Sequence, residues 1–551
     1  MGTPVKIRKL RIDELLWFID SKNVAIPGFQ RGYVWRVAQI KSLFDSLIKN
    51  YPVGSFIIWK TKKNIEARTL NGEKLPKEKY LILDGQQRMA TLFYLCNQDK
   101  FIKNNVKTSF YENCETRQKS LIDFERFYFE RTGKDQELKY TKTGTEEFNY
   151  KRFERLLGNY NFPVIVVSID DYHKAVEIFE RINQAGTRIP TETIFLSETW
   201  NESSNFAKSI KRWKMDHPDS LTKEVDTVIF IHVFAIIFQL DDKNKKKSSS
   251  IGISVKSLKK IAEVVRSEHS NIYEKKFKKV IEAVSSATRF LKEEYNIEKI
   301  SDLPSQTMLT VLSVFFYYLH EIRLDNQQKK ELHKWFWRSS LSSRYIGSGY
   351  NENTGPDARK MADLALNHKI LNLPKTGLHY SDFEKVDLNT GRSTLRNAVK
   401  QMLWLQKPLW IDGLSIERRD VERKTHQKED DHFYPYNFME EGYVGKEINN
   451  ILNLHFLPKD VNSSKGKKIP SEWLSEKIKE LKPTGDKIKE YFRRNLLPFK
   501  SIQDLRRFEK RFIRKKGHIW PEKFRKSYER FLWKRYNNFF IRELNRLQNG
   551  N

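Results

Sequence analysis

One stretch of sequence decides the fold of the amino-terminal part of the chain: Tyr80-Leu81-Ile82-Leu83-Asp84-Gly85-Gln86-Gln87-Arg88-Met89-Ala90-Thr91-Leu92. Its first four residues form a short apolar run with the composition of a β-strand, and a charged turn with a glycine follows. A helix is expected to start near Gln87. The first turn of such a helix presents backbone N–H groups to an anion. We therefore predict an anion site formed by Asp84, Gly85, Gln86, Gln87, Arg88 and Thr91.

A second loop could complete this site. Gln30 and Arg31 lie between two glycines, Gly28 and Gly32, and could clamp a phosphate. Asp84 could then hold a cation, a ribose hydroxyl or Arg31. The alternative is purely structural, in which the carboxylate and the arginines form a buried salt-bridge network. The sequence contains no G-x-x-x-x-G-K-[ST] motif, so nucleotide binding would not use a P-loop.

The rest of the chain changes character along its length. Further strand-like runs at 56–59 and 164–169 and a helical pattern at 39–49 predict an α/β or α+β domain. Helical spacing then dominates, with a buried helix at 228–238, an exposed loop at 241–250 and another loop, rich in Gly and Asn, at 347–356. Short strands and turns follow, and then helices again. We predict an α+β multidomain chain with boundaries at 1–195, 196–405, 406–480 and 481–551.

Composition narrows the class of partner. The chain has 551 residues and a formal net charge of +31, which favours a polyanion such as nucleic acid, although a solvated lysine-rich surface would give the same number. Two cysteines suit a reducing cytoplasm and cannot build a disulfide framework or a zinc site. Neither a signal-peptide pattern nor an apolar run of about 20 residues is found, so no membrane partner is expected.

A group of polar residues near the carboxyl terminus has the chemistry of phosphodiester hydrolysis. The motif Asp430-Asp431-His432-Phe433-Tyr434-Pro435 is followed by a line that runs from Ile448 to Lys465 and mixes apolar and polar residues. A neutral imidazole can take a proton from water near pH 7, and carboxylate and amide oxygens can hold Mg²⁺. Asp431, His432 and Asn462 supply these groups. His455 lies within apolar residues and is interpreted as structural.

These motifs resemble the HNH, or ββα-metal, nucleases, and more closely the carboxyl-terminal domain of GmrSD-type modification-dependent restriction endonucleases. The resemblance implies that His432 is the general base and that Asn453 braces the loop. It implies that Asp431 and Asn462 bind the metal ion and that Lys465 contacts DNA phosphate. Many relatives have His where this chain has Asp431, and the carboxylate favours a hard cation, Mg²⁺ or Mn²⁺.

The amino-terminal strings resemble the same family. They are residues 26–35, the Asp-Gly-Gln-Gln-Arg string at 84–88, and residues 179–187, which add Asn183 to the expected nucleotide site. The resemblance implies a ParB/sulfiredoxin-like fold that binds a nucleotide, GTP or ATP, and controls DNA cutting. Nucleotide hydrolysis stays open, because the sequence identifies no base for the attacking water.

Together these observations predict a metal-dependent DNA endonuclease of a modification-dependent restriction or anti-phage defence system, gated by the amino-terminal domain. The expected partners are modified or phage DNA, a nucleotide, and a second copy or another defence protein. The alternatives are a ParB-like DNA-binding regulator with an inactive nuclease domain and a non-specific nuclease toxin. Residues 501–551 hold 15 Lys/Arg, 5 Asp/Glu and ten aromatic residues, which could track a DNA strand or pack inward.

Overall fold

The structure is a computed structural model. It describes residues 5–96, 160–183, 191–199, 205–242, 251–388, 393–417, 431–435, 448–457, 465–510 and 521–550, except for residues 29, 31–34, 36, 64, 66, 71–73, 218–219, 269–270, 320–322 and 467. The chain divides into two compact units. Unit 1 comprises Met1–Ala207 and Leu258–Asn271, and unit 2 comprises Lys208–Ser257 and Ile272–Asn551.

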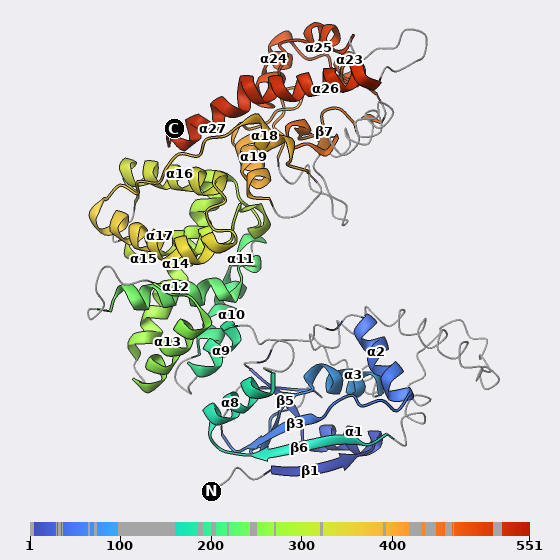
Figure 1. Cartoon of the computed structure of the whole chain (residues 1–551), viewed down its shortest axis with the longest axis vertical. Helices are drawn as coiled ribbons and strands as arrows, with labels where there is room; N and C mark the ends of the chain where they lie inside the picture. The colour runs from blue at the N-terminus through green and yellow to red at the C-terminus, as the bar shows by residue number, and fades with distance from the viewer. Residues whose placement is uncertain are drawn as a thin grey trace, which may run out of the picture. The chain divides into compact units, whose positions relative to one another are not determined.

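Unit 1 is built on a mixed six-stranded sheet with the order β1-β6-β3-β5-β2-β4 (Figure 1). Strand β3 runs parallel to β6, and β2 runs parallel to β5, whereas the other neighbours are antiparallel. The strands are β1 (Val5–Leu10), β2 (Ala25–Pro27), β3 (Phe56–Thr61), β4 (Ala67–Thr69), β5 (Lys79–Asp84) and β6 (Phe162–Ser168). The predicted strands at 56–59, 80–83 and 164–169 are therefore confirmed to within two residues.

Helices cover both faces of this sheet. Helices α1 (Ile12–Ser21), α2 (Val37–Ile48) and α3 (Gln86–Cys96) share one core with Ile82 of β5. Helix α8 (Tyr172–Asn183) packs on the other face, where Leu81 and Leu83 point. Alternate residues of a strand face opposite sides, so a strand that is buried on both sides must be apolar throughout. This explains why the central strands read as continuous apolar runs. Helices α9 (Thr191–Glu198) and α13 (Val255–Ser267) complete the unit.

Unit 2 starts with a helical region. Helices α12 and α15 are buried on most sides, and α15 packs against both α12 and α17. The helices of this region are α10 (Phe206–Asp216), α11 (Ser220–Glu224), α12 (Thr227–Leu240), α14 (Asn271–Tyr295), α15 (Thr307–Tyr318), α16 (Asn326–Leu341), α17 (Ser348–Asn367), α18 (Tyr380–Glu384) and α19 (Thr394–Leu405). None of the helices in the described residues is long and apolar enough to cross a membrane.

One sequence expectation in this region is wrong. Residues 347–356 do not form a loop, because α17 begins at Ser348 and continues through Pro356. Gly347, with φ +60°, makes the turn that precedes the helix. Proline is unfavourable inside a helix because it lacks an N–H group. Tertiary contacts hold the helix on either side of Pro356: Gly355 packs so closely that a Cβ there would lie 2.6 Å from the Ile251 carbonyl oxygen, and Asp357 pairs with Arg344.

The carboxyl-terminal part of unit 2 combines a small strand pair with helices. It contains β7 (Asp431–His432), the 3₁₀ turn η4 (Ile451–Asn453), β8 (Leu454–His455), α23 (Pro470–Leu481), α24 (Gly485–Arg494), α25 (Ile502–Glu509), α26 (Pro521–Arg535), the π-helical turn η5 (Tyr536–Phe540) and α27 (Ile541–Gln548). Phe531 of α26 packs against Phe433 and Tyr434, with ring centroids 5.6 and 4.9 Å apart. Phe531 therefore packs inward, onto the segment that follows His432, whereas Trp533 of the same helix is exposed.

Candidate functional site

The predicted catalytic histidine lies on a short antiparallel strand pair. Strand β7 pairs with β8 so that Asp431 lies opposite His455 and His432 opposite Leu454. This pairing places the Asp431-His432 motif beside Leu454 and His455, which belong to the second part of the predicted nuclease motif. The Asp431 side chain and the whole of Asn462, the two predicted metal ligands, lie outside the described residues. Within the described part of the chain, no group of three or more His, Cys, Asp or Glu side chains could hold a metal ion.

The imidazole of His432 is half-buried and is held by a neighbouring carboxamide. Its Nε2 lies 3.0 Å from Oδ1 of Asn449. An amide oxygen has no hydrogen to donate, so this contact places the hydrogen on Nε2. Nδ1 then carries the lone pair of the neutral ring. The tautomer set by Asn449 is therefore one in which Nδ1 can act as the base.

Asn453 is fully buried and holds the turn that follows His432. Its Oδ1 accepts a hydrogen bond from the Tyr434 backbone N–H at 3.0 Å. Its Nδ2 donates to the carbonyl oxygens of Tyr434 and Ile448, at 3.1 and 3.2 Å. The carbonyl oxygen of Asn453 also accepts from Phe433 N–H at 2.8 Å. Asn453 therefore holds three backbone groups of the two residues that follow the histidine, the N–H groups of Phe433 and Tyr434 and the carbonyl of Tyr434.

Two neighbouring asparagines, Asn449 and Asn450, also belong to the candidate site, although no sequence motif pointed to them. Asn449 holds the imidazole of His432, as described above. The side-chain oxygen of Asn450 accepts a hydrogen bond from Leu452 N–H at 2.8 Å. Its Nδ2 donates to the carbonyl oxygens of Phe383 and Glu384, at 3.0 and 3.1 Å, and so ties the loop to α18. Carboxamides among apolar residues are the signal that could have identified them, because a buried amide needs partners.

A buried arginine of α26 holds the backbone around η4 in place. Arg535 of α26 is fully buried, and its guanidinium donates to four backbone carbonyl oxygens, those of Leu452, Leu454, Asn495 and Leu496, at 2.6–3.0 Å. Burial lowers the pKa of Arg535 to about 9. The guanidinium fork matches several carbonyls at once. Arg535 thereby joins α26 to η4, to the first residue of β8 and to the two residues that follow α24.

Two other basic residues lie inside the protein near β7. His455 is buried, and its Nε2 lies 3.1 Å from the Tyr491 hydroxyl. Burial lowers the pKa of His455 well below its ordinary value, and the charges of Lys465 and Arg535 act in the same direction. The Lys465 ammonium donates to the carbonyl oxygen of His432 and lies 5.6 Å from the centre of the Trp473 ring. Lys465 is only 2% exposed.

The amino-terminal motif forms the predicted strand-turn-helix. Strand β5 ends at Asp84, Gly85 makes the turn with φ +85°, and α3 begins at Gln86. A Cβ on Gly85 would lie 2.5 Å from the Phe56 ring. Both the backbone angle and this contact therefore require glycine.

Arg88 connects this helix to the segment before β3. Its guanidinium lies 3.1 Å from the Asp84 carboxylate, donates to the Ser55 carbonyl oxygen at 3.2 Å, and also donates to the Val53 carbonyl oxygen. A Cβ on Gly54 would lie 2.5 Å from the same guanidinium. These contacts match the structural interpretation for the Asp84–Arg88 pair, whereas Arg31 lies outside the described residues.

Other predicted residues of this site lie close to the same turn. Gln30 is buried, and its amide donates to the carbonyl oxygens of Ile82 and Leu83, at 2.7 and 3.1 Å. The side-chain oxygen of Gln87 accepts from Trp35 N–H at 3.3 Å, and the Thr91 hydroxyl donates to the Gln87 carbonyl oxygen at 2.7 Å. The structure thus brings together the sequence motifs around Gln30 and Gln86. The Gln86 side chain is also buried. Asn183 ends α8, and its side chain is not described.

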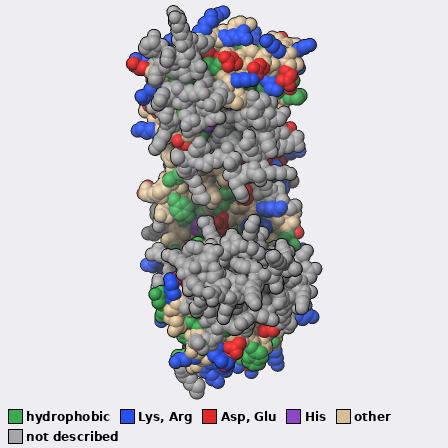
Figure 2. All heavy atoms as spheres, turned by 90° about the vertical axis from the view of Figure 1, so that its right-hand side faces the viewer, with side chains coloured by type: hydrophobic (Ala, Val, Ile, Leu, Met, Phe, Trp, Pro, Cys, Tyr) green, Lys and Arg blue, Asp and Glu red, His purple; other side chains and the backbone are tan. Residues whose placement is uncertain are grey.

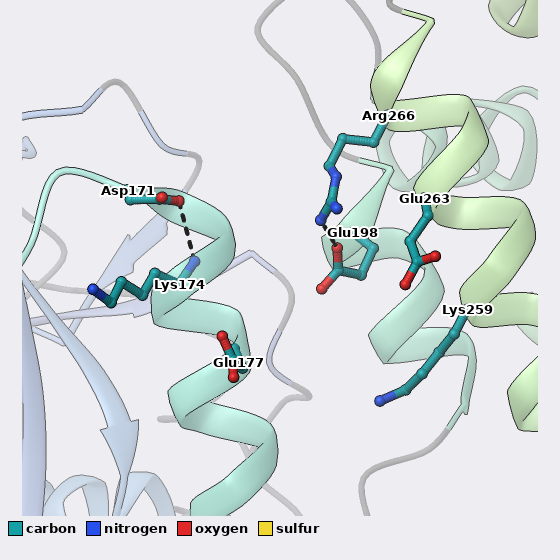
Figure 3. Close-up of a pocket in the computed structure, with 7 residues that line it drawn as sticks. All are labelled: Asp171, Lys174, Glu177, Glu198, Lys259, Glu263 and Arg266. Carbon is teal, nitrogen blue, oxygen red and sulfur yellow. Dashed lines mark hydrogen bonds and ion pairs between the residues drawn. The ribbon is translucent and has the colours of Figure 1, made fainter.

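A charged cavity of about 430 Å³ lies elsewhere in unit 1 (Figure 3). Its walls come from α8 and the residue before it, from α9 and from α13, and Arg266 pairs with Glu198 at 2.6 Å. The lining residues are Asp171, Lys174, Glu177, Glu198, Lys259, Glu263 and Arg266. None of the predicted site residues lines it, and its mixed charges do not favour an anion.

Comparison with known proteins identifies the amino-terminal region. Residues 12–200 match the family model of the GmrSD restriction endonuclease, N-terminal domain. The match contains the strand-turn-helix around Gly85 and the loop of Gln30. The chain is also 22% identical over 531 residues to an uncharacterized protein of Methanocaldococcus jannaschii, covering 84% of this chain and 86% of that protein. That similarity extends well beyond residue 200.

Proposed function

We propose that this protein is a metal-dependent DNA endonuclease of a modification-dependent restriction or anti-phage defence system. The observation that carries the proposal is the bracing of His432, whose ring is held by Asn449 and whose following turn is held by Asn453. A surface histidine would not need such support. The match of residues 12–200 to the GmrSD restriction endonuclease N-terminal domain supports the defence setting.

The proposed reaction is hydrolysis of a DNA phosphodiester. Nδ1 of His432 takes a proton from the attacking water, and Asn449 keeps the ring in the required tautomer. The Asp431 carboxylate and the Asn462 amide oxygen would hold Mg²⁺ or Mn²⁺, since oxygen donors suit hard cations. The bound cation would neutralise charge on the phosphate oxygens and the leaving oxygen. Asn453 fixes the backbone on which His432 is carried.

We further propose that unit 1 gates cutting by binding a nucleotide, GTP or ATP, or modified DNA near the start of α3. A helix amino terminus reached through a glycine turn favours a phosphate. Because the Arg88 guanidinium is engaged by two carbonyls and Asp84, we expect it to shape the turn as well as add positive charge.

The decisive test is cleavage of modified and unmodified DNA with Mg²⁺, with and without nucleotide. Wild type should cut, and His432→Ala should lose cutting while still binding DNA, because the base acts in chemistry and not in docking. His379→Ala, at an exposed histidine in the same unit, should cut like wild type. Undiminished cutting by His432→Ala would contradict the site. If the wild-type protein binds DNA without cutting it, the protein is a DNA-binding regulator. If it cuts modified and unmodified DNA equally, it is a non-specific nuclease.

A further inference from the structure

We propose that Lys465 is a positioning residue for His432, and that it acts from inside the protein rather than on the DNA. This inference rests on the proposed nuclease function. The Lys465 ammonium donates to the backbone carbonyl oxygen of His432 and lies 5.6 Å from the centre of the Trp473 ring. With only 2% of the residue exposed, the ammonium points into the protein.

The burial of this ammonium sets the first constraint on its role. Removing an ammonium from water costs free energy unless strong partners replace the water. The two partners given above, a carbonyl dipole and an aromatic face, both favour a cation, and cation–π contacts strengthen when water is excluded. A lysine that contacts DNA phosphate would instead keep its head group in solvent. The geometry therefore favours an internal role.

The peptide group between His432 and Phe433 is held at both of its polar atoms. Lys465 donates to its carbonyl oxygen, and its N–H donates to the carbonyl oxygen of Asn453 at 2.8 Å. The imidazole of the same histidine is held by Asn449 at 3.0 Å. His432 is thus restrained both through its ring and through the backbone that carries it.

Such restraint acts on the rate of reaction and not on binding. A misplacement of about 1 Å in a reacting group can cost about 10²-fold in rate. A lysine that neutralises a phosphate acts differently, because its loss weakens binding and reduces the slope of log affinity against log salt by about 1. The two roles of Lys465 therefore predict opposite results in separate measurements.

The experiment compares Lys465→Met with Lys468→Met in the full-length chain. Lys468 is an exposed lysine whose Nζ lies 2.6 Å from Glu476. For Lys465→Met we expect the single-turnover cutting rate to fall about 10- to 100-fold, with unchanged DNA affinity and salt slope, and for Lys468→Met we expect no change in rate. An unchanged rate in Lys465→Met, or a loss of affinity with a lower salt slope, would overturn the proposal.

A second measurement does not depend on activity. In deuterated protein labelled with ¹³C-carbonyl histidine and ¹⁵N-phenylalanine, only the His432–Phe433 and His455–Phe456 peptides give a one-bond correlation. His455→Gln assigns them. Lys465→Met should shift the His432 carbonyl resonance, and Lys468→Met should not. If the His432 carbonyl resonance does not move in Lys465→Met, the inference is overturned even if the wild-type protein cuts DNA. If the resonance moves but the wild-type protein does not cut DNA, only the proposed function is refuted. If Lys465→Met fails to fold, Lys465→Gln carries both measurements.

Discussion

At the scale of single residues, asparagine is the side chain on which the candidate site depends. Asn449, Asn450 and Asn453 lie within five positions, and each bonds a different part of the loop. A carboxamide can donate and accept at once, so it can satisfy both the N–H and the carbonyl oxygen of one residue. This explains why Asn453 can close the turn at Tyr434 without any charged group.

Asn453→Ala should damage both folding and cutting. The substitution leaves buried backbone groups of Tyr434 and Ile448 without their partner, and each such loss costs about 1–3 kcal/mol. We expect the free energy of unfolding, measured by urea denaturation, to fall by at least that amount, and DNA cutting to be lost. Asn367→Ala, at an exposed position ending α17, is the matched control. A stable Asn453→Ala protein would show that the loop is held elsewhere.

Glu509 should make stability depend on pH. Burial raises its pKa to about 8, although its carboxylate accepts hydrogen bonds from Ser471 N–H at 3.1 and 3.3 Å. The folded state therefore binds this proton more tightly than the unfolded state, whose pKa is near 4.5. The contribution to stability is full below pH 4.5 and is lost as pH rises toward 8.

The measurement is the free energy of unfolding across this pH range. In Glu509→Gln the fall with rising pH should be shallower than in wild type, by at most about 1.4 kcal/mol per pH unit, the limit for one proton. Glu522→Gln, at an exposed residue of α26, should follow wild type. Parallel curves for Glu509→Gln and wild type would mean that Glu509 does not retain its proton.

At the scale of elements, polar side chains lock helices to their neighbours. In unit 1, Arg88 ties α3 to the segment before β3. In unit 2, Asp357 of α17 accepts from Arg344 at 2.5 and 2.9 Å and from the Tyr345 hydroxyl at 2.7 Å. In both units these contacts join a helix to a segment outside it, residues 53–55 in unit 1 and residues 344–345 in unit 2. They therefore help to determine where each helix lies.

Arg88→Ala should loosen the turn that begins α3. The loss of its carbonyl and carboxylate contacts is expected to lower the free energy of unfolding by about 1–3 kcal/mol and to weaken nucleotide binding in calorimetry. Gly54→Ala keeps the charge but displaces the guanidinium, since its Cβ would lie 2.5 Å from it, and it also strains the backbone, because Gly54 has φ +80°. Equal nucleotide affinity in Arg88→Ala and wild type would refute the proposed pocket.

Asp357→Ala should be strongly destabilising. The Asp357 side chain is only 2% exposed, so its loss leaves a partly buried arginine without its counter-ion. Breaking one side of a buried pair costs about 3–5 kcal/mol. The exposed pair of Asp363 and Lys369 offers the control, because Asp363→Ala should change stability by less than about 1 kcal/mol. Denaturant unfolding of the full chain distinguishes the two, and similar small losses would contradict the buried network.

At the scale of the whole molecule, the chain passes between the two units more than once. Leu258–Asn271 belongs to unit 1, although the segments on both sides belong to unit 2. This segment carries most of α13, whose Leu258, Ile261 and Val265 are buried and whose Arg266 pairs with Glu198. A fragment of residues 1–207 lacks this helix. We expect it to melt at a lower temperature than a fragment of residues 1–271, and equal melting temperatures would show that α13 does not support unit 1.

Charge is also a property of the whole molecule. The net charge of +31 predicts a polyanionic partner. On the face in Figure 2, the Lys and Arg side chains at the end formed by the carboxyl-terminal helices are interspersed with Asp and Glu. The sum of charges is known from composition, but their distribution depends on which residues the fold brings to one face.

The local elements of the fold were predictable from the amino-acid sequence. The run at 80–83, the glycine turn and the following helix were predicted almost to the residue, because apolar periodicity and turn chemistry depend on neighbours in the chain. An α/β or α+β amino-terminal domain and a helical middle were predicted from the same patterns, and residues 12–200 match the family expected from their motifs.

The partner that each polar group takes depends on the tertiary fold. Arg88 bonds carbonyls 33 and 35 residues earlier, and Lys465 donates to a carbonyl 33 residues earlier. The helix through Pro356 is likewise held by residues outside it. A side chain's partner depends on distances between segments remote in sequence, and on whether water is excluded there. Periodicity and spacing contain neither quantity, so the sequence identified the chemical groups and the fold assigned their contacts.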